Sequence, residues 1–436
     1  MRSRRPSRLH RGAALVLLTF AGCAWAASGG RVSLQRAEPI YSNVQELRQL
    51  NFRTDVPLVL MDREQANRLL EREVAHHRDE AGFRRAAEVG SLTGLYAPGT
   101  DLKAQTIRVL SGRSVAFYDP GDREMIMVKR ESKPGLCSAI AGSFTRNDST
   151  EDIPIARGLT HALQDQYFGV NTALDRIADN DDRALALKSV AEGDAMLVGY
   201  CYNAGFVNAG IVGTMLTHLG DLPQPFDVQS ADTPMALRDS LIFQYTDGAR
   251  FVGEVYQRGG WRAVNTLYRN PPLSTRQILD PALYFDHSSP PLAITVGGWT
   301  PALRGWHEVA ENTYGELLLR VILTRAPGGP AQAGLARGWR GDRMVVLQKD
   351  GALTVIWIVA LSDYTNAADF ARAYQRILDR GAGGGAPAPH YVERRGAAVL
   401  AIIGPGAAQS SELAPAIWRA SVIGAGASAR PVPPRP

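Results

Sequence analysis

The stretch IARGLTHALQDQYF, residues 155–168, lies near the middle of a 436-residue chain and decides how its centre folds. Its apolar residues recur at intervals of three and four, which places them on one face of an α-helix. That stripe consists of Ile155, Leu159, Ala162, Leu163 and Tyr167. The pattern predicts a buried amphipathic helix over residues 153–168, which carries a single histidine, His161.

Helical patterns predominate on both sides of this segment, whereas strand patterns are few and short. Asp62 stands where a helix N-cap is expected, directly before a helical pattern at 63–77. The other expected helices cover 43–50, 182–204, 205–219, 233–257 and 260–269, and the expected strands cover 56–61, 115–118 and 125–128. Residues 31–342 are therefore predicted to form a mainly helical domain with a small N-terminal sheet.

The pattern changes at residue 343. Asp350-Gly351, a pair typical of tight hairpin turns, separates two strand-like runs. Strands are expected at 344–348, 353–360, 390–394 and 397–403, and a helix at 366–378. This order predicts a small C-terminal α+β unit over 343–425, and hence an α+β fold for the whole chain. The proline-rich end, 426–436, is expected to be disordered.

Residues 1–26 have the features of a secretory signal peptide. A basic start precedes an apolar run from Ala13 to Ala26, which is too short for a membrane-spanning helix, and small residues surround a cleavage position after Ala26. Phe20-Ala21-Gly22-Cys23 also resembles a bacterial lipobox, so lipidation of Cys23 is an alternative. Both readings predict an exported protein, either periplasmic or secreted, or lipid-anchored to the envelope.

The net charge of the chain depends on this export segment. The full sequence carries +5, and residues 1–26 contain five arginines and no acidic residue. Removal of the segment brings the net charge near zero, so the basic balance does not indicate a nucleic-acid or anionic-surface partner. The expected partner is a peptide or a protein, with membrane contact only through the signal peptide or a lipid anchor.

Two cysteines remain after cleavage, Cys137 and Cys201. In an oxidising compartment two cysteines can form a disulfide, and two buried free thiols are the alternative. The sequence leaves both readings open, and we carry a Cys137–Cys201 disulfide forward as the prediction.

The helix at 153–168 raises the question of a metal site. Zinc proteases place two histidines four residues apart on one helix, where they bind the metal, and a glutamate after the first histidine polarises the attacking water. No His-Glu-x-x-His occurs in this chain. His307-Glu308 lacks the second histidine and is expected to lie on an exposed helix, and His76-His77 with Glu80 on a solvated helix face.

The surroundings of the helix nevertheless follow a recognisable order. The segments that carry it are SVAFYDP (114–120), LTHALQDQ (159–166), EGDA (192–195), YTDGARFV (245–252), GW (260–261), PPLST (271–275) and GWRGD (338–342). Together they resemble a family of exported bacterial zinc metallopeptidases of the gluzincin type, in which His-Glu-x-x-His is followed by an EGDA segment. The resemblance covers most of the mature chain and implies a metallopeptidase-like domain.

The chain departs from this family at the residues that do the chemistry. Arg157 stands where the first histidine ligand is expected, and Gly158 stands at the position of the general base. Only His161 and Glu192 remain of the four functional positions. Arginine keeps its proton at ordinary pH and cannot bind a metal, and glycine has no side chain to act as a base. We therefore expect no cofactor and no catalytic residue.

Arg157 has two readings, a surface residue or a replacement for the metal. In the second, its guanidinium forms an ion pair with Glu192 and joins the two helices where zinc would lie. Gly158 leaves a gap, which either widens the cleft or is filled by a neighbouring side chain. Asp165 and Asp194 would be second-shell groups in a metal-binding relative, and here we expect them to cap or pair.

Three functional readings follow. The first is an exported, non-catalytic metallopeptidase homologue that keeps a protease-like cleft for a peptide or protein partner. The second is an active zinc-dependent peptidase or hydrolase with an altered metal site at His161 and Glu192. The third is an envelope structural protein that reuses the scaffold.

Overall fold

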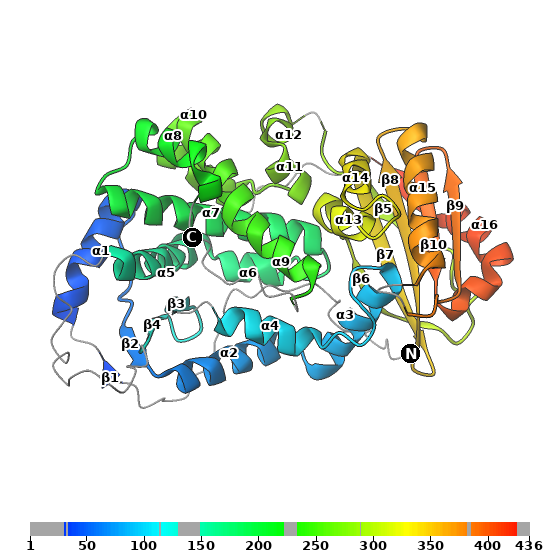
Figure 1. Ribbon diagram of the computed structural model, residues 1–436, viewed down its shortest axis with the longest axis horizontal. Coiled ribbons are helices and arrows are strands. Elements are labelled where there is room, and N and C mark those ends of the chain that lie inside the picture. The colour runs from blue at the N-terminus through cyan, green and yellow to red at the C-terminus, as the bar shows by residue number, and fades with distance from the viewer. Residues whose placement is uncertain are drawn as a thin grey trace, which may run out of the picture.

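The computed structural model describes residues 30–31, 34–112, 115–129, 149–221, 233–287, 289–381 and 385–424. The predicted signal peptide with Cys23, the cysteine at 137 and the tail at 426–436 lie outside these residues. The architecture is α+β, as the sequence predicts. Figure 1 shows an elongated molecule with a helical half at one end and a sheet, β6 to β10, at the other.

The helical half is built around a central buried helix, α7 (Asp181–Ala204), against which α5 (Ser149–Phe168) and α10 (Gly248–Arg269) pack. Four residues of the stripe predicted on α5 are buried, with at most 4% of the surface of Ile155, Leu159, Ala162 and Leu163 exposed, whereas Tyr167 is only partly buried. Further helices complete this half: α1 (Leu34–Arg48), α2 (Arg63–His77), α3 (Glu80–Thr93), α4 (Leu102–Ser111), α6 (Val170–Asp175), α8 (Ala209–Thr217), α9 (Met235–Ile242), α11 (Thr275–Leu279) and α12 (Pro281–Asp286). Asp62 caps α2 as predicted.

A small sheet lies beside α5 in the order β1-β2-β4-β3. Its strands are β1 (Gly30–Arg31), β2 (Leu58–Met61), β3 (Ala116–Asp119) and β4 (Glu124–Val128). Strands β2 and β4 are parallel, and the other two pairs are antiparallel. Because β3 ends this order and packs on α5, it brings an edge of the sheet to the helix that carries Arg157 and His161.

The C-terminal half is an antiparallel sheet in the order β6-β7-β8-β10-β9. Its strands are β6 (His307–Asn312), β7 (Trp339–Lys349), β8 (Ala352–Leu361), β9 (His390–Arg395) and β10 (Ala398–Ile403). Alternate residues of β8 face opposite sides, where α15 (Tyr364–Asp379) covers Trp357 and α16 (Ser410–Ala420) covers Ile356 and Ile358. Burial on both faces explains why β8 is apolar along nearly its whole length.

The predicted strand–strand–helix–strand–strand order of the C-terminal unit is confirmed by β7, β8, α15, β9 and β10. Asp350 and Gly351 form the turn between β7 and β8, both with positive φ, at 50° and 83°. The sheet also takes in β6, which begins at His307, well before residue 343. The remaining elements between and after the two halves are β5 (Ala293–Thr295), α13 (Gly315–Leu323), α14 (Pro330–Ala333) and β11 (Val422–Gly424).

Several expectations were wrong in detail. His307 and Glu308 lie in β6 and not on a helix, because pairing with β7 supplies the partners of their backbone groups. The helix expected at 233–257 is divided by a π-helical segment, Phe243–Asp247. The break expected near residue 260 is a kink within α10, where Gly260 takes a φ of 60° that only glycine adopts readily. Helix α1 begins at Leu34, nine residues before the expected start at 43.

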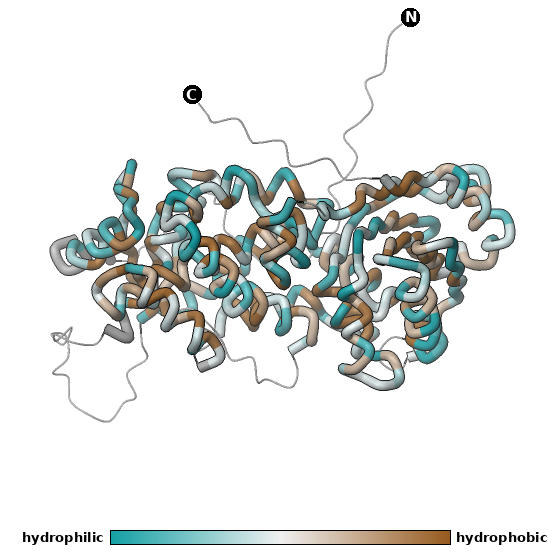
Figure 2. The backbone as a smooth tube through the Cα atoms, turned by 90° about the horizontal axis from the view of Figure 1, so that it is seen from above, coloured by the Kyte–Doolittle hydropathy of each residue, from teal (hydrophilic) through white to brown (hydrophobic). Residues whose placement is uncertain are grey.

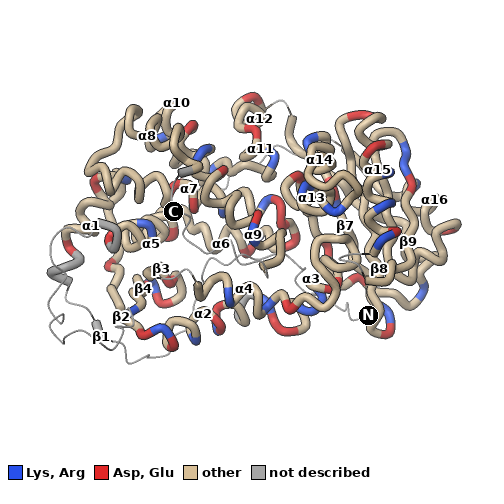
Figure 3. The backbone as a smooth tube through the Cα atoms, in the orientation of Figure 1, with Lys and Arg blue, Asp and Glu red and all other residues tan. Residues whose placement is uncertain are grey.

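The distribution of apolar and charged residues matches a folded core with a mixed surface. Figure 2 shows brown and teal alternating along most helices. Within the described ranges no single helix is long and apolar enough to cross a membrane, although the bent pair α7 and α8 passes a test of length and composition together. Figure 3 shows acidic and basic residues interspersed over both halves.

A buried carboxylate, Asp342 of β7, holds the start of α13 against the C-terminal sheet. Its oxygens accept hydrogen bonds from the backbone N–H groups of Tyr314 and Gly315, each at 2.9 Å. They also accept hydrogen bonds from the indole N–H groups of Trp339 at 2.8 Å and Trp357 at 2.9 Å. Asp342 thus ties the start of α13 to the sheet with four donors, which is what a buried carboxylate needs to be stable.

We predict that Asp342→Asn lowers the free energy of unfolding by about 3 kcal/mol, because the amide presents a donor to two N–H groups that then lack an acceptor. Urea denaturation followed by tryptophan fluorescence measures the loss. The control is Asp369→Asn, which removes a charge from a partly exposed pair with Arg372 and should change the same quantity by about 0.5 kcal/mol or less. Equal effects of the two substitutions would contradict the assigned role of Asp342.

Candidate functional site

The two residues that the sequence singled out as remnants of a metal site lie together. His161 projects from α5 and Glu192 from α7, and Nε2 of His161 lies 3.4 Å from Oε2 of Glu192. The two side chains are 24% and 16% exposed, so the contact is largely shielded from water. The packing of α5 on α7 therefore brings together two positions that are 31 residues apart in the sequence.

Arg157 joins the same carboxylate from one turn earlier on α5. Its Nη2 donates to Oε2 of Glu192 at 3.4 Å, and both side chains are 16% exposed. The guanidinium carbon lies 4.9 Å from the ring centroid of Tyr245, in the π-helical segment, at a cation–π distance. A single oxygen of Glu192 thus faces both the arginine and the histidine.

Glycines make room for this arrangement. A Cβ at Gly199 would lie 3.0 Å from Cγ of Arg157, so the absence of a side chain there lets the arginine stem pass. A Cβ at Gly193 would lie 2.2 Å from the carbonyl oxygen of Gly248, so α7 approaches α10 more closely than any other residue would permit. The two glycines therefore allow α7, which carries Glu192, to pack closely against Arg157 on one side and against α10 on the other.

The gap at Gly158 is filled by a neighbour. A Cβ placed there would lie 2.4 Å from Cε and 2.5 Å from Sδ of Met125, a fully buried residue of β4. It would also lie 3.4 Å from the backbone nitrogen of Tyr118. Of the two readings of Gly158, the structure therefore shows the second, in which a side chain occupies the space and the site is not widened there.

Behind the histidine lies a buried polar network. Nδ1 of His161 lies 2.9 Å from Oε1 of Gln164, whose Nε2 donates to Oδ2 of Asp194 at 3.2 Å. Nη2 of Arg48 also donates to that oxygen at 3.1 Å, while Nε of Arg48 lies 2.9 Å from Oδ1 without the alignment of a hydrogen bond. Tyr268 completes the set with a hydroxyl that donates to Asp194 at 2.7 Å. Asp194 therefore pairs with Arg48 and accepts hydrogen bonds from Gln164 and Tyr268, which is the kind of structural role expected from the sequence.

Asp165 lies at the other end of α5 from Arg157. It accepts hydrogen bonds from the hydroxyl of Tyr118 and the amide of Asn171, both at 3.3 Å. Burial raises the pKa of Asp165, although these two hydrogen bonds oppose the shift. The hydrogen bond from Tyr118 to Asp165 connects β3 to α5. No contact given for the described residues joins Asp165 to His161.

The charges of the site favour a protonated histidine. Burial by itself would lower the pKa of His161, but the charge of Glu192 and the hydrogen bonds to Glu192 and Gln164 raise it above the ordinary value. Lys188, one turn before Glu192 on α7, has its pKa lowered to about 7, chiefly by burial. Sequence reasoning missed Lys188 and Met125, since nothing in a single sequence places a lysine or a methionine at this contact.

The cluster contains two side chains of types that bind metals, His161 and Glu192. Arg157 also places a positive charge beside Glu192. Within the described ranges, no three side chains of the types His, Cys, Asp and Glu lie close enough together to hold an ion.

The other predicted sites are outside this cluster. Cys201 is buried at the end of α7 and forms no disulfide with a described residue, and the structure does not describe residue 137, so the predicted disulfide stays a prediction. Burial raises the pKa of the Cys201 thiol to about 12, which makes it unreactive at neutral pH. His76 and His77 end α2, and Glu80 begins α3.

Comparison with known proteins identifies one domain family. The family is described as a domain of unknown function, DUF8575, and its model matches residues 302–414, which contain β6 to β10 and the start of α16. No curated protein and no solved structure matches the chain. The match is confined to the C-terminal half, so it does not reach α5 or α7.

We predict that the Arg157–Glu192 contact contributes a coupling energy of about 1–2 kcal/mol, because the pair is charged and shielded. The measurement is a double-mutant cycle of Arg157→Met and Glu192→Gln, with unfolding free energies from urea titration. The reference is Arg68 and Glu64, an exposed pair on α2, for which the same cycle should give about 0.5 kcal/mol or less. Coupling no larger than in this reference would show that Arg157 is a bystander.

Whether Gly158→Ala raises or lowers the unfolding free energy should depend on Met125. Alanine is favoured over glycine inside a helix by about 1 kcal/mol. The added methyl group would overlap Met125, and overpacking costs about 1–3 kcal/mol, so Gly158→Ala should destabilise the wild-type protein. In a Met125→Ala background the overlap disappears, and Gly158→Ala should then raise the unfolding free energy. If Gly158→Ala changes the unfolding free energy in the same direction in the wild type and in Met125→Ala, Met125 does not fill the gap.

Proposed function

We propose that this protein is an exported, non-catalytic homologue of a zinc metallopeptidase, in which an arginine has replaced the metal. The observation that carries the proposal is the position of the Arg157 guanidinium against Glu192, beside the surviving His161. A cation is needed there because Glu192 is largely buried, and a guanidinium supplies it without any hydrolytic chemistry.

The chemistry of the cluster supports the loss of activity. Metal-dependent hydrolysis needs an ion with an open coordination position and a base to take a proton from water. The position of that base is Gly158, and the space beside it holds Met125. His161 remains as the one histidine of the cluster, and its raised pKa and its contact with Glu192 make it part of the ion-pair cluster.

Among the described residues no strand pairs with β3 on the side away from β4, where α5 packs, and we take this edge as support for a role in binding an extended peptide. The backbone N–H of Val128 donates to the carbonyl of Val115 at 2.8 Å, and pairs alternate along an antiparallel ladder. The backbone groups of Ala116 and Tyr118 therefore point away from β4, toward the side where α5 lies. An extended segment can add to such an edge through main-chain hydrogen bonds. We propose this edge, beside Arg157 and His161, as the part of the cleft that receives a peptide or a partner segment.

The proposed setting is the cell envelope or its exterior, reached through the signal peptide at 1–26 or through a lipid on Cys23. No cofactor and no nucleic-acid partner is part of the proposal. The alternative, an active zinc-dependent hydrolase with ligands His161 and Glu192, requires a dication beside Arg157, which like-charge repulsion opposes. A purely structural role in the envelope differs from the first proposal in that it needs no ligand at the edge of β3.

The zinc content of the purified mature protein tests the proposal. After dialysis against micromolar zinc, we expect the wild type to hold none and Arg157→His to hold about one equivalent, because the substitution restores three ligands on two packed helices. The control is Arg157→Gln, which removes the same charge without adding a ligand and should hold none.

Two results would overturn the proposal in different ways. If Arg157→His holds no more zinc than Arg157→Gln, the cluster is not a converted metal site. If the wild type itself holds one equivalent that His161→Ala abolishes, the hydrolase alternative is correct. The restoration of Gly158→Glu belongs in a second step together with Met125→Ala, because the buried methionine occupies the space that the glutamate needs.

A further inference from the structure

Strand β9 forms one edge of the C-terminal sheet, at the end of the molecule away from α5 (Figure 1). Its ladder with β10 continues into Pro389, whose carbonyl accepts a hydrogen bond from the backbone N–H of Gly404 at 2.7 Å. Because backbone groups alternate in direction along an antiparallel strand, those of His390, Val392 and Arg394 point away from β10. Among the described residues no strand pairs with β9 on that side, and no group accepts a hydrogen bond from the N–H of Val392 or Arg394.

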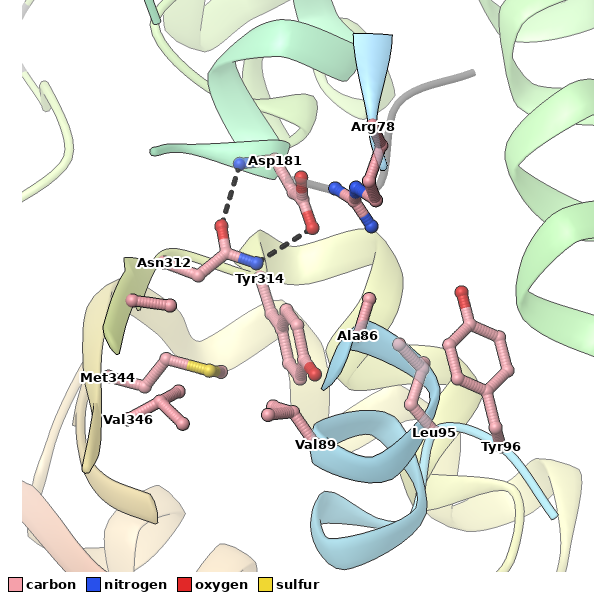
Figure 4. A pocket seen from close by; sticks show the side chains of 11 residues that line it. Arg78, Ala86, Val89, Leu95, Tyr96, Asp181, Asn312, Tyr314, Met344 and Val346 are labelled. Atoms are coloured by element: carbon pink, nitrogen blue, oxygen red, sulfur yellow. Dashed lines mark hydrogen bonds between the residues drawn. The ribbon is translucent and has the colours of Figure 1, made fainter. Parts of the chain in front are cut away.

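The opposite edge of the same sheet, β6, is covered by the helical half. The carbonyl of Val309 in β6 accepts a hydrogen bond from Nη1 of Arg85 on α3 at 3.4 Å. At the end of β6, Asn312 donates to Oδ2 of Asp181 at 2.7 Å and accepts from the backbone N–H of Asp181 at 3.0 Å, as the dashed lines in Figure 4 show. Of the two edges, β9 is therefore the one that the described part of the chain leaves open.

An arginine lies over an aromatic ring on each side of this open edge. On the side covered by α15, the guanidinium carbon of Arg394 lies 3.8 Å from the ring centroid of Tyr364. On the side covered by α16, that of Arg395 lies 5.5 Å from the ring centroid of Trp418. Tyr364 is 62% exposed, so a large aromatic surface faces solvent beside the strand. Tyrosine, tryptophan and arginine are the residue types that are enriched at binding interfaces.

The charge at this end of β9 is positive. Arg394 donates to the carbonyl of Gly396 at 3.0 Å and has no carboxylate partner within the described ranges. Arg395 is paired with Glu393 at 2.8 Å, and the two side chains are 49% and 25% exposed. Arginine can only donate hydrogen bonds and always carries its charge, so its complement is a carboxylate or another anionic acceptor. A segment that adds to this edge should therefore carry an acidic side chain opposite Arg394.

We propose that β9 receives an extended, acidic segment of a partner protein, which adds to the sheet as a further strand. Every pair of neighbouring strands in this sheet is antiparallel, and the added segment runs antiparallel as well. Its main chain exchanges hydrogen bonds with Val392 and Arg394. An apolar residue of the segment lies opposite Val392, and two positions away on the same face an acidic residue lies opposite Arg394. The inference is independent of the proposed function, since it involves neither Arg157 nor the edge of β3.

A second copy of this chain is a poorer occupant of the edge. Pairing of β9 with itself about a two-fold axis is antiparallel, and centres at Val392 and Glu393 give the longest overlap. These two centres place His390 or Val392 opposite Arg394, and a centre at Arg394 opposes two arginines. None of the three registers supplies a carboxylate to Arg394, and like charges directly opposite each other are destabilising.

Binding of a labelled peptide, Asp-Glu-Lys-Val-Thr-Val, to the full mature protein tests the proposal by fluorescence anisotropy. In antiparallel pairing its glutamate faces Arg394, its lysine faces Glu393 and its first valine faces Val392. We expect saturable binding that weakens as salt is added, because the charges are partly exposed. The control peptide, Lys-Lys-Glu-Val-Thr-Val, has the charges reversed and should bind about tenfold more weakly.

Methylation of the peptide backbone separates strand addition from attraction between charges alone. N-methylation of the first valine removes an N–H that donates to β9, whereas N-methylation of the lysine alters an N–H that points to solvent. We expect the first change to abolish binding and the second to leave the affinity within about twofold of the unmodified peptide. Equal effects of the two methyl groups would overturn strand addition.

Two variants locate the binding on β9. Arg394→Gln should weaken the peptide about threefold to fivefold, as expected for the loss of an exposed charge pair. Val392→Pro removes an N–H that points away from β10, where an edge strand tolerates proline, and should abolish binding while the fold is kept. The control is Arg68→Gln, which makes the same change of charge on an exposed residue of α2 and should bind the peptide like the wild type.

Should Val392→Pro fail to fold, the two methylated peptides still decide the question with the wild-type protein. Absence of saturable binding in the wild type, or equal affinity in Arg394→Gln and the wild type, would overturn the proposal. A dimer that forms without peptide and that Val392→Pro converts to a monomer would assign the edge to a second copy instead.

Discussion

The structure depends on the pairing of charges along one buried helix. Helix α7 crosses the centre of the helical half. Five charged side chains in its first fourteen residues take part in this pairing, namely Asp181, Asp182, Lys188, Glu192 and Asp194. A charge removed from water must be compensated by a partner or by hydrogen bonds. The partners come from different parts of the chain, so the need to compensate α7 determines which elements surround it.

Each acidic residue of α7 recruits a separate element. Asp181 pairs with Asn312 of β6, and Asp182 accepts a backbone hydrogen bond from Thr275 at the start of α11 at 2.9 Å. Glu192 meets Arg157 and His161 of α5, and Asp194 meets Arg48 of α1. A carboxylate such as Glu192 needs a positive neighbour whether or not the protein catalyses a reaction. Arg157 satisfies this constraint, because its guanidinium supplies a positive charge beside the carboxylate.

The sequence predicted the parts of this arrangement that depend on local pattern. The stripe of α5, the cap at Asp62 and the hairpin at Asp350-Gly351 follow from short-range rules of helices and turns. It also directed attention to Arg157 and Glu192, because their neighbours resemble a known motif. It did not reveal Met125 against Gly158 or Arg48 against Asp194, since both contacts join residues whose proximity depends on tertiary packing. The strand at His307 was missed for the same reason, because its pairing partner β7 lies about thirty residues later.

Several charged side chains of α7 also share one face of the helix. Asp181, Lys188 and Glu192 are separated by seven and then four residues, a spacing that aligns them on a single stripe of the helix. Lys188 stands between the two ends, and both Asp181 and Glu192 act to raise its pKa against the effect of burial, while Arg78 lowers it. The charge of Lys188 near neutral pH therefore responds to changes at either end.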